Sequence, residues 1–303
     1  MTIFNVDKVI CMRNYLLDFF EQFEYHKHDA TELMTAYDKI IANGDAKAIL
    51  SGTICAYKEN NSIDFNNIIL PANKKISELA CLNHYTVDLL VYICLTKHLK
   101  ELYIEKNIDL QIYHDSVLDL KWKLEECKAV KGVCGVFVAY WFVNFFNLTR
   151  FALGRLQFEP FNVTFDYEKN GIKLEKDKSV ALSVHIPRTG TPIDKQSCDN
   201  SYALAKEFFK KQLGESPVFV CFSWLLHPQI EIIAPKHTNV YRFFKEYDVV
   251  YSKDNDGEDL WRLFDTDEKD PYKLPTDSSL RRCFVNHLKN GGRVGEGFGI
   301  KRP

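Results

Sequence analysis

The chain has 303 residues, of which 46% are hydrophobic, and its 39 basic and 41 acidic side chains leave a net charge of −2. This length corresponds to one large domain or two ordinary ones, with enough apolar residues for a sizeable core. The nearly balanced charge, which collects into no basic face, argues against a nucleic-acid-binding protein.

Cysteines and apolar segments bear on the compartment. The 9 cysteines are scattered and form no Cys-x-x-Cys pair, which favours free thiols over a disulfide framework. Asp7, Arg13 and Asp18 interrupt the N-terminal apolar residues, so we expect no signal peptide. The longest apolar run, residues 133–146, is too short to span a membrane. We therefore expect a cytoplasmic protein with no membrane contact.

The first half of the chain predicts helices throughout. Apolar side chains recur at helical spacing between turn signals such as Asn43-Gly44 and Lys131-Gly132. The expected helices cover residues 9–23, 29–41, 45–57, a segment that opens at Leu70-Pro71, 85–103, 115–128 and 134–147.

The composition changes near Thr149. Arg13 is the only arginine before this point, and every other arginine follows it. Arginine suits bidentate contacts with phosphate and carboxylate groups, so its segregation places any anion chemistry in the C-terminal half. For each single arginine, the alternative is solvent exposure with a local ion pair. We expect a domain boundary here, with a helical domain at residues 1–149 and a second domain at residues 150–303.

Beyond Thr149, strands and helices alternate. The nearly continuous apolar run 217–226 predicts a central strand covered on both faces, and 180–186 predicts a second central strand. The other expected elements are a hairpin of 151–159 and 162–168 around Pro160, a helix from about Asp199 to Leu213, a helix at 239–247, a strand pair at 248–252 and 259–265, a helix at 277–288, and a glycine-rich strand at 294–300. The whole chain is therefore expected to be α+β, with a helical domain followed by a mixed sheet domain.

A candidate anion site lies between the strand at 180–186 and the helix that follows. The loop from Pro187 to Asp199 is bracketed by proline and glycine, and it leads into a helix start. Backbone N–H groups and the helix dipole can point at one spot in such a unit. The alternative is that the unit is purely structural, as most strand–loop–helix units are.

Five separated motifs occur in order in this chain: FALGRLQFE, ALSVHIPRTGTPID, FVCFSWLLHP, HTNVYRFFKEYDVV and LPTDSSLRRCFVNHLKNGGRVGEGFGI. Together they resemble bacterial acyltransferase domain-containing proteins, which join a helical N-acyltransferase N-terminal domain to a GNAT-like C-terminal domain. The resemblance implies an acyl-CoA-dependent N-acyltransferase. Its donor would be acetyl-CoA or another acyl-CoA, and its acceptor an amine of a small molecule or a peptide.

The resemblance also implies a site for the pyrophosphate of CoA in the loop 187–192. The usual family pattern is Gln/Arg-x-x-Gly-x-Gly/Ala, whereas this chain offers Arg188-x-Gly190 without a second glycine. Pro192 contributes no N–H. The residues implied to bind the cofactor are Ile186, Arg188, Thr189, Gly190 and Thr191.

For catalysis, the resemblance implies a base that takes the proton of the attacking amine and an acid that helps the thiolate leave. The candidates are His185, Glu159 and Tyr241. The alternatives are a structural histidine at 185 and a solvated turn residue at 159. Phe243 and Phe244 fall about where the family's acid tyrosine is expected.

These departures leave a second functional class open, a non-catalytic binding module that keeps the fold. No metal-ligand cluster, P-loop or Ser-His-Asp order stands out in the sequence. Gly295, Gly297 and Gly299 alternate at strand spacing and indicate close backbone packing in preference to a phosphate cradle.

Overall fold

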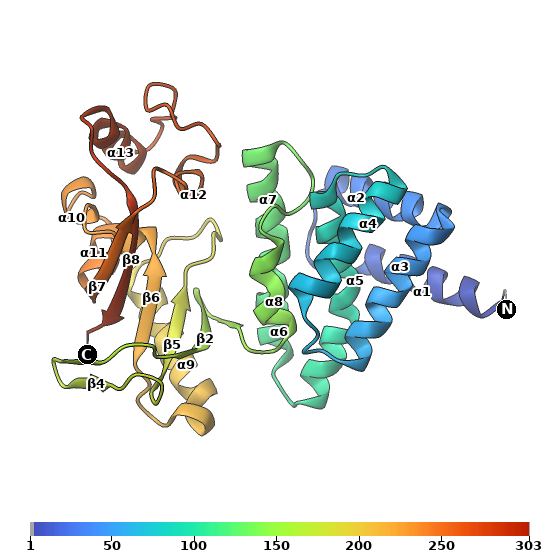
Figure 1. Ribbon diagram of the computed structural model, residues 1–303, viewed down its shortest axis with the longest axis horizontal. Coiled ribbons are helices and arrows are strands. Elements are labelled where there is room, and N and C mark those ends of the chain that lie inside the picture. Colours follow the sequence, from blue (N-terminus) through green and yellow to red (C-terminus); the bar gives the residue numbers. More distant parts are fainter. Residues whose placement is uncertain (1–2, 303) are drawn as a thin grey trace. The chain divides into compact units, whose positions relative to one another are not determined.

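The computed structural model describes residues 3–302, which form two compact units. The first unit ends at Thr149 and is helical, and the second begins at Arg150 and contains the main sheet (Figure 1). The predicted α+β class, with helices first and a mixed sheet after them, is confirmed.

The N-terminal unit is built around α5, His84–Glu105, whose side chains are buried on nearly every face over its middle turns. The side chain of Asn43 caps the helix that follows it, as a residue with a short polar side chain does at a helix start. The other elements are α1 Ile3–Gln22, α2 Lys27–Ala42, α3 Gly44–Glu59, the π-helical turn η1 Phe65–Ile69, α4 Leu70–Ala80, α6 Leu110–Val117, α7 Asp119–Lys131, the 3₁₀ turn η2 Ala139–Phe142, and α8 Val143–Phe146.

The helix predicted at residues 134–147 is wrong for its first part. Gly135 lies against the backbone of Tyr85, so close that a Cβ at this position would be 2.4 Å from the Tyr85 carbonyl carbon. Val136 donates its N–H to the same carbonyl oxygen at 3.0 Å. This tertiary contact holds the segment irregular, and helical turns begin only at Ala139.

The C-terminal unit contains a six-stranded sheet in the order β1-β2-β5-β6-β8-β7. Only β5 and β6 pair in parallel, and the other neighbours are antiparallel. The strands are β1 Phe151–Leu153, β2 Leu156–Asn162, β5 Val180–His185, β6 Phe219–Ser223, β7 Tyr247–Asp254 and β8 Gly295–Lys301, with β3 Tyr167–Lys169 and β4 Ile172–Leu174 as a separate hairpin. The helices are α9 Lys195–Leu213, η3 Trp224–Leu226, α10 Ile230–Ile233, α11 Asn239–Lys245, α12 Trp261–Phe264 and α13 Ser279–Lys289. The two predicted central strands, β5 and β6, are confirmed as central.

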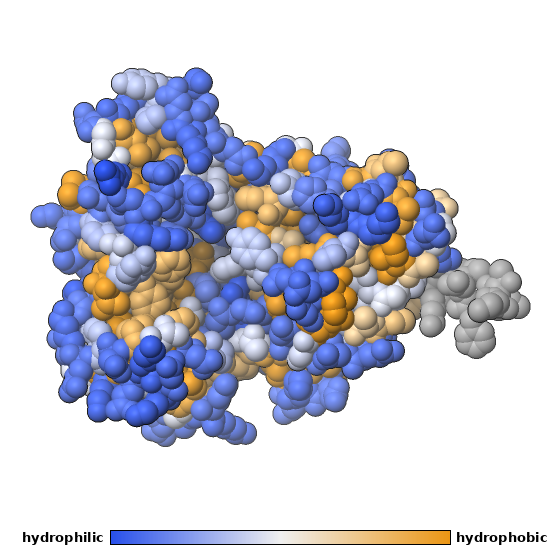
Figure 2. Space-filling view, viewed as in Figure 1, coloured by the Kyte–Doolittle hydropathy of each residue, from blue (hydrophilic) through white to orange (hydrophobic). Residues whose placement is uncertain are grey.

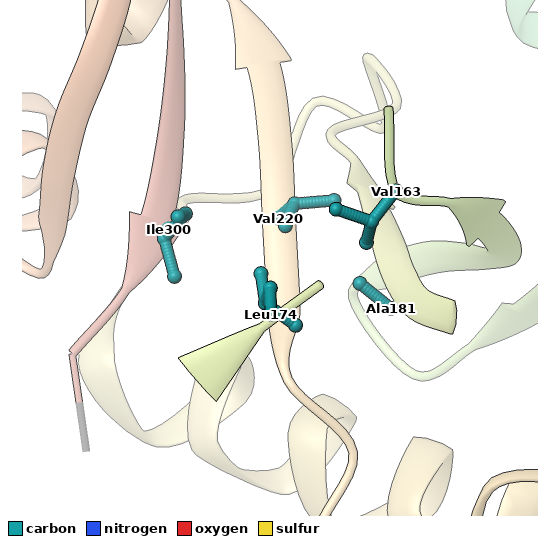
Figure 3. Packing of buried hydrophobic residues seen from close by; sticks show 5 residues of the cluster. All are labelled: Val163, Leu174, Ala181, Val220 and Ile300. Carbon is teal, nitrogen blue, oxygen red and sulfur yellow. The ribbon is translucent and has the colours of Figure 1, made fainter. Parts of the chain in front are cut away.

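The two faces of the sheet have different cover. On one face, Phe158 and Phe219 pack against Tyr202 of α9, with ring centroids 6.0 and 4.8 Å from the Tyr202 ring. On the opposite face, the β3–β4 hairpin lies over the sheet. Figure 3 shows Leu174 of this hairpin together with four buried side chains that form one cluster with it: Val163, Ala181, Val220 and Ile300.

The predicted hairpin around Pro160 is wrong, because the turn lies at Gly154-Arg155 and Pro160 sits inside β2. Gly154 has a φ of +73°, which glycine adopts without strain. Pro160 pairs with Leu182, whose own N–H is directed to β6 and donates to Val218 O at 2.8 Å. The missing N–H of Pro160 therefore faces away from β5, toward the side where β1 has already ended, and no ladder hydrogen bond is lost.

Two further predictions in this unit need correction. Residues 259–265, expected to be a strand, include α12, because the buried Leu260 and Phe264 are four residues apart and fit one helix face. α9 begins at Lys195 instead of near Asp199, since Asp194 provides the N-cap by accepting from the Ser197 N–H at 3.0 Å.

All nine cysteines are free, as predicted from their spacing. Within residues 3–302, none of the helices combines the length and the apolar character needed to cross a bilayer. The same residues contain no group of three or more His, Cys, Asp or Glu side chains arranged to hold a metal ion.

The glycines of β8 allow close packing, as predicted. A Cβ at Gly295 would be 2.0 Å from Lys253 O of β7, and one at Gly297 would be 2.0 Å from Leu226 O of η3. These contacts hold β8 tightly between its neighbours, which in turn positions β6.

Replacing Gly297 with alanine should destabilise the protein, because β8 has to move away from the Leu226 carbonyl. We expect the free energy of unfolding to fall by roughly 1–3 kcal/mol, the usual range for overpacking. The control is Gly52→Ala in the middle of α3, where nothing lies within 4 Å of the new Cβ. That change should raise stability by about 0.5–1 kcal/mol. Equal melting temperatures in calorimetry for the two variants would contradict this account.

Candidate active site

The central feature of the site is the place where β5 and β6 stop pairing. Their ladder consists of Leu182↔Phe219 and Ser183↔Val220 only. β5 then continues to His185 while paired with β2, and β6 continues to Ser223 while paired with β8. The outer edges of both strands remain hydrogen-bonded, and the inner edges separate at the C-terminal ends of the parallel pair. Backbone groups on these inner edges are available to a bound group.

The loop after β5 is held by a side chain from the β1–β2 turn. The Arg155 guanidinium donates to the carbonyl oxygens of Pro187 at 2.9 Å, Thr191 at 3.0 Å and Pro192 at 3.3 Å. Its backbone N–H donates to Ser201 Oγ of α9 at 2.7 Å. Because a trans peptide directs its N–H opposite to its carbonyl, the Arg188 N–H points away from Arg155. Arg155 thus orients these three loop carbonyl groups toward the β1–β2 turn.

Inside the loop, the predicted cofactor-binding residues have defined partners. Gly190 has a φ of +76°, and nothing lies within 4 Å of the position where a Cβ would be. The turn therefore needs glycine for its left-handed backbone conformation, because a side chain would meet no steric clash there. Thr189 Oγ1 lies 2.6 Å from Thr191 Oγ1 and accepts from the Thr191 N–H at 3.2 Å. That N–H, which the sequence suggested as a ligand donor, is already used within the loop. Ile186 is half-buried where β5 ends.

The Arg188 side chain, predicted to contact phosphate, is paired with Asp265. The two terminal nitrogens of its guanidinium group, Nη1 and Nη2, donate to Oδ1 and Oδ2 of Asp265. A phosphate group at Arg188 therefore has to compete with this carboxylate. The predicted cofactor role of Arg188 remains a prediction.

The structure brings His185 and Glu159 together. The β2–β5 register places Gln157 opposite His185 and Glu159 opposite Ser183, so both side chains emerge on one face of the sheet. His185 Nε2 lies 2.7 Å from Glu159 Oε1. Arg150, at the start of the unit, donates to both Glu159 oxygens at 3.0 and 2.9 Å. The solvated turn predicted as the alternative for Glu159 is wrong, since its side chain is only 14% exposed.

Charges in this cluster set the protonation states of the two groups. Burial raises the pKa of Glu159, but hydrogen bonds from His185 and Arg150 outweigh it and hold the pKa at about 2. Burial lowers the pKa of His185, and the Glu159 contact partly offsets that effect. At neutral pH the pair is therefore an ionised carboxylate and a neutral imidazole. The carboxylate can only accept, so Nε2 carries the proton and Nδ1 the lone pair. Such an arrangement suits His185 to act as a base and leaves Glu159 as its orienting partner.

Tyr241 lies outside this cluster. It is in the first turn of α11, where its N–H donates to the Thr238 cap at 3.2 Å. α11 packs against α9, which covers the sheet face opposite to Glu159 and His185. Phe243 and Phe244 are buried in the same helix, and Tyr247 bonds the Tyr202 hydroxyl at 2.8 Å in the core. The acid role predicted for Tyr241 stays a prediction.

Three residues of the site were not assigned a role from sequence: Arg150, Arg155 and Asp265. The only sequence signal was the concentration of arginines after Thr149. This signal does not reveal the partners of the arginines, because the partners are distant in sequence. Arg155 donates to Pro187 O, 32 residues later, and Arg188 donates to Asp265, 77 residues later.

Family models match both units of the chain. The model of the GNAT-like C-terminal domain matches residues 150–301, and that of the N-acyltransferase N-terminal domain matches residues 14–148. Together they account for nearly the whole chain. The protein therefore belongs to the acyltransferase family that joins an N-acyltransferase N-terminal domain to a GNAT-like C-terminal domain. A comparison with curated proteins gives no match.

Solved structures share the fold at low sequence identity. A crystal structure of an acyltransferase in complex with decanoyl-CoA and teicoplanin has a TM-score of 0.74 at 20% identity, over 95% of this chain and 88% of that chain. An acyltransferase mutant in complex with octanoyl-CoA gives 0.72 at 19% identity, over 95% and 88%. An acyltransferase in complex with CoA and 10C-teicoplanin gives 0.71 at 20% identity, over 94% and 87%.

The Glu159 cluster makes the stability of the protein depend on pH. The pKa of Glu159 is lower in the folded protein than in the unfolded chain, so the folded state binds fewer protons. Its stabilisation is complete above the unfolded pKa of about 4.5 and is lost as the pH falls toward 2. Glu159→Gln should lower the free energy of unfolding at pH 7 by about 3 kcal/mol, because Arg150 loses its carboxylate.

Urea unfolding followed by circular dichroism at several pH values checks this expectation. The difference between wild type and Glu159→Gln should narrow between pH 4.5 and 2. The control is Glu175→Gln, which removes an exposed carboxylate that pairs with Lys173 and Lys178. It should change stability little. A Glu159→Gln effect as small as that of the control would contradict the buried cluster.

Proposed function

We propose that the protein transfers an acyl group from a CoA thioester to an amine. The single observation that carries this proposal is the separation of β5 from β6 after Ser183↔Val220, directly before the loop held by Arg155. The separated inner edges offer a slot for the part of acyl-CoA that carries the thioester. The loop 187–192 and the start of α9 offer backbone donors for the pyrophosphate of CoA. Membership of the acyltransferase family supports the same reading.

In this reaction the amine nitrogen attacks the thioester carbonyl carbon and forms a tetrahedral intermediate. His185 takes the proton of the amine, and Glu159 holds the imidazole in the tautomer that can accept it. Backbone N–H groups near Val184–Ile186 stabilise the oxyanion. The carbon–sulfur bond then breaks and CoA leaves as a thiolate, which is protonated by water or by Tyr241.

Donor and acceptor follow from chemistry and from the relatives. The solved acyltransferases hold decanoyl-CoA, octanoyl-CoA or CoA, and two of them hold teicoplanin or 10C-teicoplanin. We extend to this chain an acyl-CoA donor and an acceptor amine on a small molecule or peptide. Ile186, Arg188, Thr189, Gly190 and Thr191 form the proposed cofactor-binding loop.

A non-catalytic binding module is the second candidate, and two observations favour it. Phenylalanines occupy the α11 positions where the family's acid tyrosine is expected. In addition, Asp265 accepts from the Arg188 guanidinium, and Asp194 accepts from the Ser197 N–H in the first turn of α9. The two candidates differ in one measurable respect, since only an enzyme releases free CoA in the presence of an amine.

The test combines calorimetry with a thiol-release assay. Wild type should bind CoA, octanoyl-CoA and decanoyl-CoA, and should release CoA when supplied with amine acceptors. Binding without release over a broad amine panel favours the module. Absence of heat with every CoA ligand overturns the acyltransferase proposal and leaves the binding module, for another ligand or a protein, in its place.

His185→Ala should leave CoA affinity nearly unchanged and lower turnover about 10²- to 10⁴-fold, the usual contribution of a general base. The acid limb of the pH–rate profile should lie below pH 6.5, because burial lowers the His185 pKa from that value. Glu159→Gln should shift that limb further down, since the Glu159 contact raises the His185 pKa.

The matched control is His98→Ala, which removes another histidine–glutamate pair, His98–Glu101 at 2.8 Å on α5. It should retain turnover. Full activity of His185→Ala, or an acid limb unmoved by Glu159→Gln, would remove His185 from the mechanism.

A further inference from the structure

Two arginines converge on one carboxylate beside the loop 187–192. Arg188 Nη2 lies 2.9 Å and Arg281 Nη2 lies 2.7 Å from the same oxygen, Asp265 Oδ2. Arg188 comes from the loop after β5, Arg281 from α13, and Asp265 from the end of α12. Three segments that are distant in sequence thus meet at this carboxylate.

Arg281 is held independently of Asp265. Its Nη1 donates to both carboxylate oxygens of Asp277 at 3.0 and 2.9 Å, and its Nε donates to Leu263 O at 2.8 Å. Its side chain is only 16% exposed. Arg281 therefore keeps its position whether or not Asp265 accepts from it.

Asp265 has a fixed backbone and a side chain that borders solvent. It ends α12 with a φ of +58°, and the neighbouring Phe264 is buried. Its side chain is 24% exposed, and that of Arg188 is 44% exposed. Figure 2 shows polar side chains gathered over the α12 and α13 end of the C-terminal unit. A turn of the Asp265 side chain needs no backbone movement.

Without the Asp265 carboxylate, two guanidinium groups would face the same point. A second anion with several oxygens satisfies both of them, and phosphate matches the planar donor fork of arginine. Because the Asp277 carboxylate neutralises Arg281 in part, the attraction is strongest for a ligand with more than one negative charge.

We propose that Asp265 competes with a phosphate group for one place, and that Arg188 and Arg281 hold that phosphate once Asp265 turns away. The ligand class is a phosphate-bearing one, a phosphoanhydride such as that of the CoA donor. This proposal rests on the proposed function for the identity of the ligand, and on the Arg188–Asp265–Arg281 contacts for the site itself. Asp265 is then a competitor that weakens binding, and the two arginines are binding residues.

Asp265→Asn isolates the charge. Asparagine tolerates the left-handed backbone conformation as aspartate does, so the end of α12 is preserved. The control is Asp277→Asn, which removes a carboxylate that contacts Arg281 and not Arg188. Calorimetry at low salt uses three probes: inorganic pyrophosphate, CoA, and pantetheine, which lacks phosphate.

Asp265→Asn should tighten pyrophosphate and CoA by about two- to fivefold, the scale of a partly exposed ion pair, and should leave pantetheine unchanged. The gain should shrink with added salt. Asp277→Asn should have a smaller effect. Adding Arg281→Ala to Asp265→Asn should abolish the gain.

Weaker or unchanged pyrophosphate binding in Asp265→Asn overturns the proposal, and means that Asp265 positions Arg188 for another role. If pyrophosphate binding tightens while no variant binds CoA, the phosphate site stands and the proposed acyl-CoA function fails. If the wild type binds CoA and Asp265→Asn gives no gain, the acyl-CoA function stands and the competitor role fails.

Discussion

The interrupted ladder between β5 and β6 is the constraint on which the C-terminal unit depends. β5 is held by β2 as far as His185, and β6 is held by β8 as far as Ser223. Beyond Ser183↔Val220, each strand thus keeps its partner on the outer side, so the two inner edges can separate without loss of the sheet. The glycines of β8 contribute to this support, because they let β8 pack closely against β7 and η3. β8 in turn pairs with β6 and holds it in place. An opening in the middle of a sheet is stable only with such support on both sides.

Charge in this unit is arranged as local pairs instead of a basic field. Arginines in the described residues contact nearby carboxylates at several positions: Arg150–Glu159, Arg188–Asp265, Arg242–Glu246, Arg262–Asp259, Arg281–Asp277 and Arg293–Asp254. The local ion pairs that the sequence suggested as an alternative are therefore present. Among them, the Arg150–Glu159 pair is the most enclosed, and the hydrogen bonds from His185 and Arg150 hold the pKa of Glu159 at about 2 although burial alone would raise it.

Sequence reasoning succeeded where one segment carries its own signal. The apolar run at 217–226 located the central strand β6, and the helix expected at 239–247 corresponds to α11, Asn239–Lys245. It failed where a choice depends on a distant neighbour. Pro160 was predicted to lie in a turn, but it fits inside β2 because its missing N–H faces the side where β1 has ended.

The same limit applies to the site. His185 and Glu159 were each candidates, but only the register of β2 against β5 brings them to one face. Asp265 gave no signal, because its partner Arg188 lies 77 residues away. Side-chain chemistry is readable from a sequence, whereas pairing between segments is decided by tertiary packing.

The hydrogen bonds from Arg155 to the loop 187–192 show where the shape of this loop is encoded in the sequence. Three carbonyl groups of the loop are oriented by one side chain that lies in the β1–β2 turn, 32 residues before Pro187. The resemblance implies a second glycine that this loop lacks, and the loop carbonyls are here oriented by a side chain from outside the loop. The shape of this loop is therefore encoded by two segments that are separated in sequence, and the residues of the loop alone do not reveal it.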